Sequence, residues 1–199
     1  MRIIKYIVAI FLILIVIFGY LIYSGSQIVI GDKSPTETFL AKQSLQLLAL
    51  VGDPRVPHML ASLKVFHSDN KAEQKAGFSF LEKESESGSC YSTGKVGWAY
   101  QKGLGVKPNL DIAVSNYVEA AKCGMTYWQI MLAHSYEQGY LGLSVDLEMA
   151  SFWKDKEPKI HIASYNCWVA SFYKDGYFPG NPTKQSEYQT LCEKEGEDF

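Results

Sequence analysis

The feature that most constrains the fold is a pattern of a small residue, a tyrosine and a glycine that returns twice along the chain. Gly97, Tyr100 and Gly103 recur after 36 residues, and again after a further 37, with the same internal spacing. The two later copies consist of Ala133, Tyr136 and Gly139, then Ala170, Tyr173 and Gly176. A period of this length is typical of solenoids in which each unit packs on the next.

Each copy has the features of a helical hairpin. The small residue lets two helices approach closely, the tyrosine three positions later lies on the same helix face, and the glycine supplies the positive φ that ends many helices. The best copy covers residues 97–124. After its glycine-rich turn, Asn109 is a predicted N-cap for a second helix, and the apolar stripe of that helix consists of Ala113, Tyr117, Ala120 and Ala121.

Helical patterns also precede the repeats. Apolar residues at helical spacing predict a helix over residues 38–51, and a helical pair follows at 56–66 and 71–83. The polar residues 67–70 separate the members of that pair and contain residues that favour helix caps. Residues 53–88 are therefore expected to form a divergent first hairpin.

The repeat residues resemble those of the Sel-like repeat (SLR) family, which is related to the tetratricopeptide repeats. The resemblance is strongest over residues 89–124 and 125–161 and weaker over 162–195. It implies an all-α protein whose residues 38–199 form an α/α solenoid of about four helical hairpins. One departure is Pro158, which should end the second helix of the third hairpin early.

The first 30 residues predict a membrane anchor. Arg2 and Lys5 precede an uncharged apolar run over residues 7–23, long enough to cross most of a bilayer. A cleaved secretory signal is the alternative, although the run exceeds the usual ~7–15 residues of such signals. Both interpretations place the rest of the chain outside the inner membrane. The expected organisation is an anchor over 1–30, a linker over 31–37 and the solenoid over 38–199, on the periplasmic side.

Four cysteines occur in two matched pairs. Cys90 and Cys123 lie at nearly equal distances from the turn of one hairpin, and Cys167 and Cys192 do so in the last hairpin. Equal arm lengths place the members of each pair side by side, because each helical residue adds ~1.5 Å. We therefore expect the disulfides Cys90–Cys123 and Cys167–Cys192 in an oxidising compartment. Four buried free thiols are the alternative.

Composition and motifs argue against catalysis and nucleic-acid binding. The net charge of −2 provides no basic surface for DNA or RNA. The four histidines lack metal-ligand spacing, and no phosphate-binding glycine loop or nucleophile elbow is present. Ser68 and Lys71 match a bare Ser-x-x-Lys pattern without the companion motifs of penicillin-recognising enzymes. We expect no enzyme activity, no cofactor, no metal and no small-molecule substrate.

A protein partner is the remaining expectation. In hairpin solenoids the first helices line the concave face, where partners usually dock. Three equivalent positions in three successive units predict the contact residues Lys95, Trp98, Gln101, Met131, His134, Glu137, Trp168, Ser171 and Lys174. Tryptophan is a frequent interface anchor, but Trp98 and Trp168 could equally fill the seams between units.

Small SLR proteins of this layout are similar to the immunity proteins encoded with secreted antibacterial effectors, notably phospholipases, such as those of type VI secretion. The resemblance implies an inner-membrane protein that binds and neutralises such a toxin in the periplasm. The alternative is an envelope adaptor or signalling regulator that binds endogenous proteins.

Overall fold

The computed structural model describes Leu45 and residues 56–156 and 162–196. These residues form eight bounded α-helices and no strand, which confirms the all-α class. The helices are α3 (Val56–Phe66), α4 (Lys71–Glu86), α5 (Cys90–Lys102), α6 (Leu110–Lys122), α7 (Thr126–Gln138), α8 (Leu147–Lys154), α9 (Ile162–Lys174) and α10 (Pro182–Gly196).

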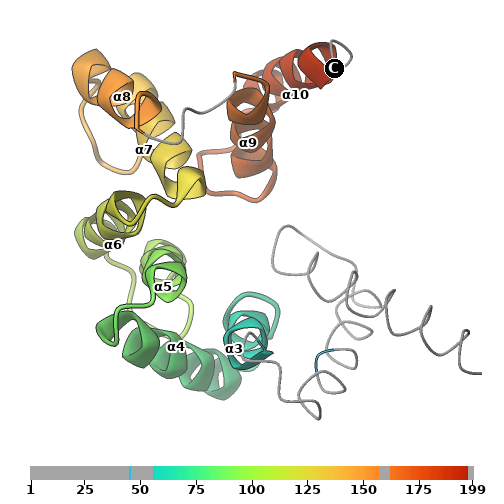
Figure 1. Ribbon diagram of the computed structural model, residues 1–199. Helices are drawn as coiled ribbons and strands as arrows, with labels where there is room; N and C mark the ends of the chain where they lie inside the picture. Colours follow the sequence, from blue (N-terminus) through green and yellow to red (C-terminus); the bar gives the residue numbers. More distant parts are fainter. Residues whose placement is uncertain (1–44, 46–55, 157–161, 197–199) are drawn as a thin grey trace, which may run out of the picture.

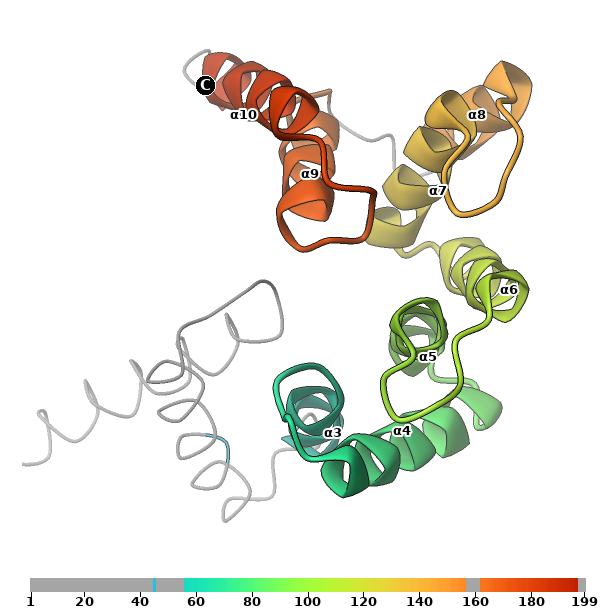
Figure 2. The same ribbon diagram turned by 180° about the vertical axis from the view of Figure 1, so that it is seen from behind.

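Consecutive helices pair into four hairpins, α3–α4, α5–α6, α7–α8 and α9–α10. The hairpins follow one another along a curved path, seen from opposite sides in Figures 1 and 2. Helices α5, α7 and α9 each pack on the preceding hairpin, α9 through its contact with α7. The predicted solenoid of helical hairpins is therefore present in the described residues.

Side-chain caps and glycines set the helix boundaries. The Asn109 side chain accepts a hydrogen bond from the first turn of α6, as predicted, and Asp146 does the same at the start of α8. Gly103 and Gly139 end α5 and α7 with φ of 69° each, in the left-handed region. This is the conformation that the repeated glycine predicts, because a β-carbon disfavours it.

The core lies between the helices of successive hairpins. Its largest buried cluster joins α6, α7, α8 and α9, where Tyr117 stacks on Trp128 with ring centroids 4.8 Å apart. A second cluster joins α3, α4 and α5 around Val65, Phe78 and Leu81. The apolar interior of the described residues is therefore divided into clusters, and the partly buried Tyr100 packs against both of these two.

The third hairpin has a short second helix. Helix α8 contains eight residues, whereas α6 contains 13. It ends at Lys154, ahead of Pro158, as a helix approaching a proline is expected to end. Pro158 itself lies outside the described residues.

The predicted anchor (1–30), linker (31–37) and helix over 38–51 lie outside the described residues, except Leu45, and stay predictions. Among the residues that the structure does describe, no helix combines the length and apolar character needed to span a membrane.

Candidate functional site: the seams of α5, α7 and α9

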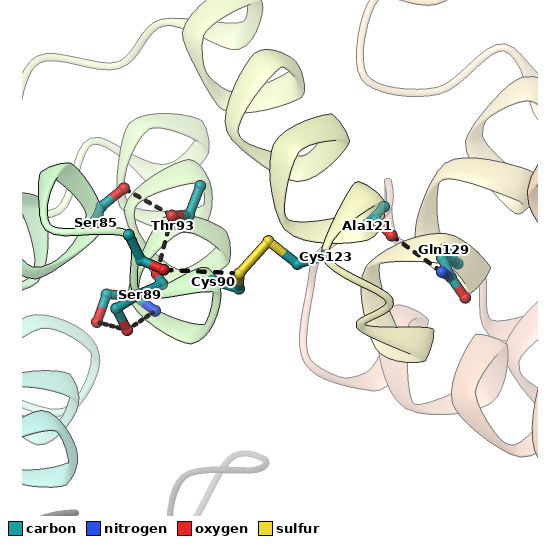
Figure 3. The surroundings of a disulfide bond; sticks show 9 residues. Ser85, Ser89, Cys90, Thr93, Ala121, Cys123 and Gln129 are labelled. Atoms are coloured by element: carbon teal, nitrogen blue, oxygen red, sulfur yellow. Dashed lines mark hydrogen bonds between the residues drawn. A yellow bond between two sulfur atoms is a disulfide. The ribbon is translucent and has the colours of Figure 1, made fainter. Parts of the chain in front are cut away.

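Both predicted disulfides are present. Cys90–Cys123 joins α5 to α6, as Figure 3 shows, and Cys167–Cys192 joins α9 to α10. No cysteine is left free. Cys90–Cys123 lies at the open end of its hairpin, whereas Cys167–Cys192 joins the interiors of its two helices. Equal arm lengths were a sufficient guide to both pairings.

The predicted contact residues of α5 lie in a seam that another part of the chain fills. Trp98 is stacked between Phe66 at the end of α3 and Tyr177 in the α9–α10 turn, with centroid distances of 4.0 and 4.4 Å. The chain therefore returns from its last hairpin to its second. This favours the seam interpretation of Trp98.

Polar groups of α5 hold the same turn by its backbone. Gln101 donates from Nε2 to the carbonyl oxygen of Tyr177 at 2.5 Å, and Lys102 donates to the carbonyl oxygen of Gly176. The hydroxyl of Tyr117 in turn donates to Oε1 of Gln101 at 2.6 Å. The α9–α10 turn is thus fixed on α5 by two backbone carbonyls as well as by the Tyr177 ring.

Lys95 is buried in the same seam. Its Nζ lies 5.1 to 5.7 Å from the ring centroids of Phe66, Tyr91 and Trp98. Burial lowers the pKa of Lys95 to about 8, although the negative charge of Asp175 opposes the shift. With 6% of its surface exposed, Lys95 offers almost no area to a partner.

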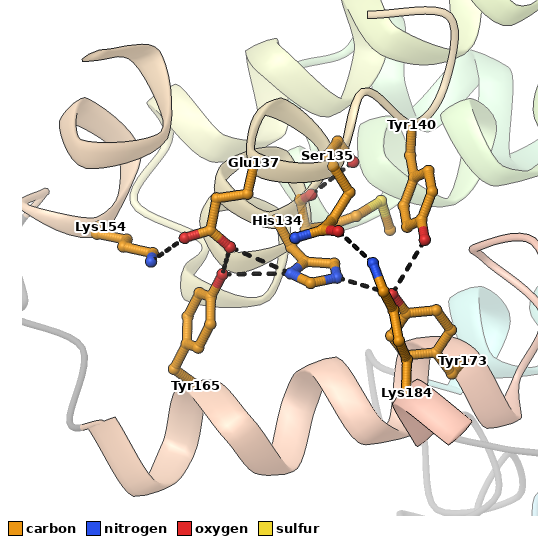
Figure 4. Close-up of polar contacts among 10 residues, drawn as sticks. His134, Ser135, Glu137, Tyr140, Lys154, Tyr165, Tyr173 and Lys184 are labelled. Carbon is orange, nitrogen blue, oxygen red and sulfur yellow. Dashed lines mark hydrogen bonds and ion pairs between the residues drawn. The ribbon is translucent and has the colours of Figure 1, made fainter. Parts of the chain in front are cut away.

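The predicted contact residues of α7 are also mostly internal. Met131 and His134 are fully buried. His134 approaches Glu137 through Nδ1 at 3.2 Å and the Tyr173 hydroxyl through Nε2 at 3.0 Å (Figure 4). A neutral imidazole that donates from Nδ1 and accepts at Nε2 satisfies both contacts. Burial accordingly lowers the pKa of His134, while Glu137 opposes the shift.

Glu137 is the centre of this polar cluster. It accepts hydrogen bonds from the Tyr165 hydroxyl at 2.6 Å and from the Lys154 ammonium group, in addition to His134. Burial alone would raise the pKa of Glu137, but these hydrogen bonds and the charge of Lys154 lower it to about 2. The carboxylate therefore stays ionised and joins α7, α8 and α9.

The predicted residues of α9 are the most accessible of the set. Trp168 is partly buried and presents an edge to Tyr127, with centroids 5.2 Å apart. Ser171 is partly exposed and donates to the Trp168 carbonyl oxygen at 2.8 Å, and Lys174 is exposed. These three residues follow one another at helical spacing on one face of α9. Their role in binding stays a prediction, as it does for all nine residues.

The side chains of the Ser-x-x-Lys pattern are hydrogen-bonded to neighbouring residues. The Ser68 hydroxyl donates to Glu73 at 2.7 Å and Lys71 donates to Gln74, so the Ser-x-x-Lys residues belong to the start of α4.

A second group, which the sequence did not reveal, brings His58 within 3.2 Å of the Ser92 hydroxyl and 3.6 Å of Glu84. Ser92 is fully buried, so a substrate could not reach it in this arrangement.

Tyr177 and Phe66 were missed by the sequence analysis. A signal for Tyr177 exists, because the residue after each repeat glycine is large and apolar or aromatic: Leu104, Tyr140 and Tyr177. No group of three potential metal ligands comes together among the described residues.

Comparison with known proteins identifies the fold. No protein-family model and no curated protein matches the chain. The solved structure of c5321, a protective antigen present in uropathogenic Escherichia coli strains and displaying an SLR fold, is 18% identical with a TM-score of 0.50. The match covers 79% of this chain but only 34% of c5321.

A Sel1 repeat protein from Oxalobacter formigenes is 29% identical, with a TM-score of 0.45. That match covers 57% of this chain and 86% of the other. Together with the four hairpins and their repeated caps, the similarity to c5321 shows that the described part of this chain has the SLR fold.

Proposed function

We propose that this protein is a non-catalytic binding module for another protein, and that the partner is a secreted antibacterial effector, for example a phospholipase, which it neutralises. Residues 7–23 would hold it in the inner membrane, with the solenoid in the periplasm. The observation that carries the binding role is the SLR fold itself, because stacked hairpins present extended surfaces suited to proteins.

Two further observations support the compartment and the partner class. Disulfides form and persist in oxidising compartments such as the periplasm, and all four cysteines are paired. The assignment of an effector as partner rests on the resemblance in layout to small SLR immunity proteins. An endogenous envelope protein as partner is the alternative outcome.

The accessible row on α9 is the proposed contact surface. Much of the α5 and α7 rows lies inside the seams, whereas Trp168, Ser171 and Lys174 retain exposed surface. Trp168 supplies a large, rigid ring and Lys174 a mobile positive charge, a combination that suits an acidic surface with an apolar centre.

The test is capture of a partner by the full-length chain carrying a C-terminal tag, from cells that also produce a secreted antibacterial phospholipase as the candidate effector. We expect the effector to be recovered and the cells to survive. The double substitution Trp168→Ala with Lys174→Glu should weaken capture by at least about tenfold. Lys107→Glu, an equally exposed charge reversal on the α5–α6 turn, should leave capture within about twofold.

Recovery of an endogenous envelope protein without protection from the effector would replace this proposal by the adaptor function. If both sets of substitutions weakened capture equally, the contact surface would not be the α9 row. Circular dichroism of each variant separates loss of contact from loss of fold.

A further inference from the structure

The last second helix differs from its counterparts in what it buries. The earlier ones bury side chains at repeated positions: Phe78 and Leu81 in α4, Ala113, Tyr117, Ala120 and Ala121 in α6, and Ala150 and Trp153 in α8. No side chain of residues 182–194 in α10 is fully buried. Apolar burial therefore contributes less to holding α10 than to holding the other second helices.

Helix α10 packs closely along α9, but the side chains it places there are only partly buried, and few contacts join it to other helices. The Tyr188 ring lies 5.2 Å from the His134 ring and 6.2 Å from the Tyr173 ring. Lys184 donates to Gln138 on α7. Besides the connecting turn, the Cys167–Cys192 disulfide joins α10 to α9 covalently. A 15-residue helix without a buried apolar face is marginal in water on its own, so this bond matters more here than in a hairpin whose second helix buries apolar side chains.

The hairpin α5–α6 provides an internal comparison. It carries its own disulfide, Cys90–Cys123, which joins the start of α5 to the C-cap of α6. Helix α6, however, places the fully buried Tyr117 and three buried alanines against its neighbours. Loss of that bond would leave α6 held by packing.

We propose that the Cys167–Cys192 disulfide is a redox-controlled latch: its reduction by a dithiol releases α10 from α9 and uncovers the rings of Tyr173 and His134 that Tyr188 covers, while the other hairpins stay folded. The inference concerns a different property from the proposed binding function and does not depend on the identity of the partner.

The chemistry is a thiol–disulfide exchange that balances in two steps. A thiolate of the dithiol attacks one sulfur of the bridge, forming a mixed disulfide and releasing the other cysteine as a thiolate, which takes up a proton. The second thiol of the reductant loses its proton and attacks the mixed disulfide. The products are two cysteine thiols and the oxidised reductant. Cys167 and Cys192 are both partly exposed, so a reductant can approach them.

Only α10 would be released, because α9 and the turn after it are held by their own buried side chains. Helix α9 buries Val169, Ala170 and Phe172, and the turn after it buries Tyr177 and Phe178 against other hairpins. The Glu137 cluster also ties α9 to α7 through Tyr165. The uncovered surface would therefore stay in place when α10 leaves, and oxidation of the two thiols would restore the cover.

The test is hydrogen exchange, followed by mass spectrometry, on the oxidised full-length chain and on the Cys167→Ser/Cys192→Ser variant. In the variant, we expect amides of residues 182–196 to exchange at least about tenfold faster, with α5, α6 and α7 within about twofold of the oxidised protein. Treatment of the natural chain with a dithiol should reproduce the change in α10, so the result does not depend on the serine substitutions.

The matched control is Cys90→Ser/Cys123→Ser, in which the amides of α6 should keep their protection to within about twofold. Unchanged protection of α10 in the Cys167→Ser/Cys192→Ser variant would overturn the latch. So would faster exchange spread over α7 and α9, because α10 would then be part of the cooperative core. Hydroxyl-radical labelling of Tyr173 should rise only when the second bridge is open.

Discussion

Single residues decide how closely the helices approach. Gly97 faces α6, and a β-carbon at this position would lie 2.8 Å from a ring carbon of Tyr117 and 2.9 Å from the Ala113 carbonyl oxygen. The carbonyl cannot move without the helix that carries it. The small residue that opens each repeat is therefore required here by the spacing of two backbones.

Replacing Gly97 by alanine should lower the free energy of unfolding by about 1–3 kcal/mol, because α5 and α6 would have to separate. Urea unfolding measures the change. Gly180→Ala is the control: a β-carbon there meets no atom within 4 Å, so its effect should stay within about 0.5 kcal/mol. Equal effects of the two substitutions would contradict the close-approach argument.

The Glu137 cluster predicts acid sensitivity. The folded pKa of Glu137 is about 2, below its ordinary value, so the ionised carboxylate stabilises the fold above about pH 5. That contribution is lost as pH falls towards 2, as the unfolded chain binds the proton first. Burial also lowers the pKa of His134, which adds a loss of stability as pH falls below its ordinary value.

Urea midpoints between pH 7 and pH 3 should therefore decrease, and Glu137→Gln should reduce that decrease by on the order of 2 kcal/mol in unfolding free energy. Glu119→Gln, at an exposed ion pair with Lys122, is the control and should leave the pH dependence nearly unchanged. Parallel pH profiles for the natural chain and Glu137→Gln would show that this carboxylate does not determine the acid response.

Residue roles that depend on local backbone geometry could be predicted from the sequence. The positive φ of Gly103 and the cap at Asn109 follow from neighbours a few positions away. The burial of Lys95 and His134 could not be predicted in this way. Their environment comes from Phe66 and Tyr173, on other hairpins, and depends on how far the solenoid curves.

At the scale of whole elements, helix α5 contacts both its neighbouring helices and the distant α9–α10 turn. Helix α5 packs on α6 and α4 as a repeat predicts, but it also binds the α9–α10 turn through Trp98, Gln101 and Lys102. The sequence therefore predicted the hairpins and the early end of α8. It did not predict that the concave side of α5 would be occupied by the chain itself.

Trp98→Ala should consequently destabilise the protein more than Trp168→Ala. The first change removes a ring stacked on both sides and loosens two elements, for a loss of about 2–4 kcal/mol. Trp168 has an edge contact with Tyr127, so its loss should be smaller. Denaturant midpoints for the two variants provide the test, and a greater loss for Trp168→Ala would refute this ranking.

At the scale of the whole molecule, the contact between α5 and the last turn changes how the solenoid behaves. Hairpin solenoids usually depend on contacts between neighbouring units, so their ends can unfold separately. Here the second and fourth hairpins are joined directly. With both disulfides formed, the hairpins from α5 to the α9–α10 turn should therefore unfold as one unit.

Tryptophan fluorescence and far-ultraviolet circular dichroism should give coincident urea transitions for the natural chain. Tyr177→Ala removes the ring that joins the hairpins and should separate the two transitions. Coincident curves for this variant would mean that contacts between neighbouring hairpins are sufficient for cooperativity.

The contact between α5 and the α9–α10 turn cannot form until both have been synthesised. Gln101 and Tyr177, its hydrogen-bond partner, are 76 residues apart. At ~5–20 residues added per second, the ribosome needs about 4 to 15 seconds to make the chain between them. Throughout that interval Trp98 lacks one of its two covering rings. The nascent chain is therefore most prone to aggregation after its second hairpin has been made and before its fourth is finished.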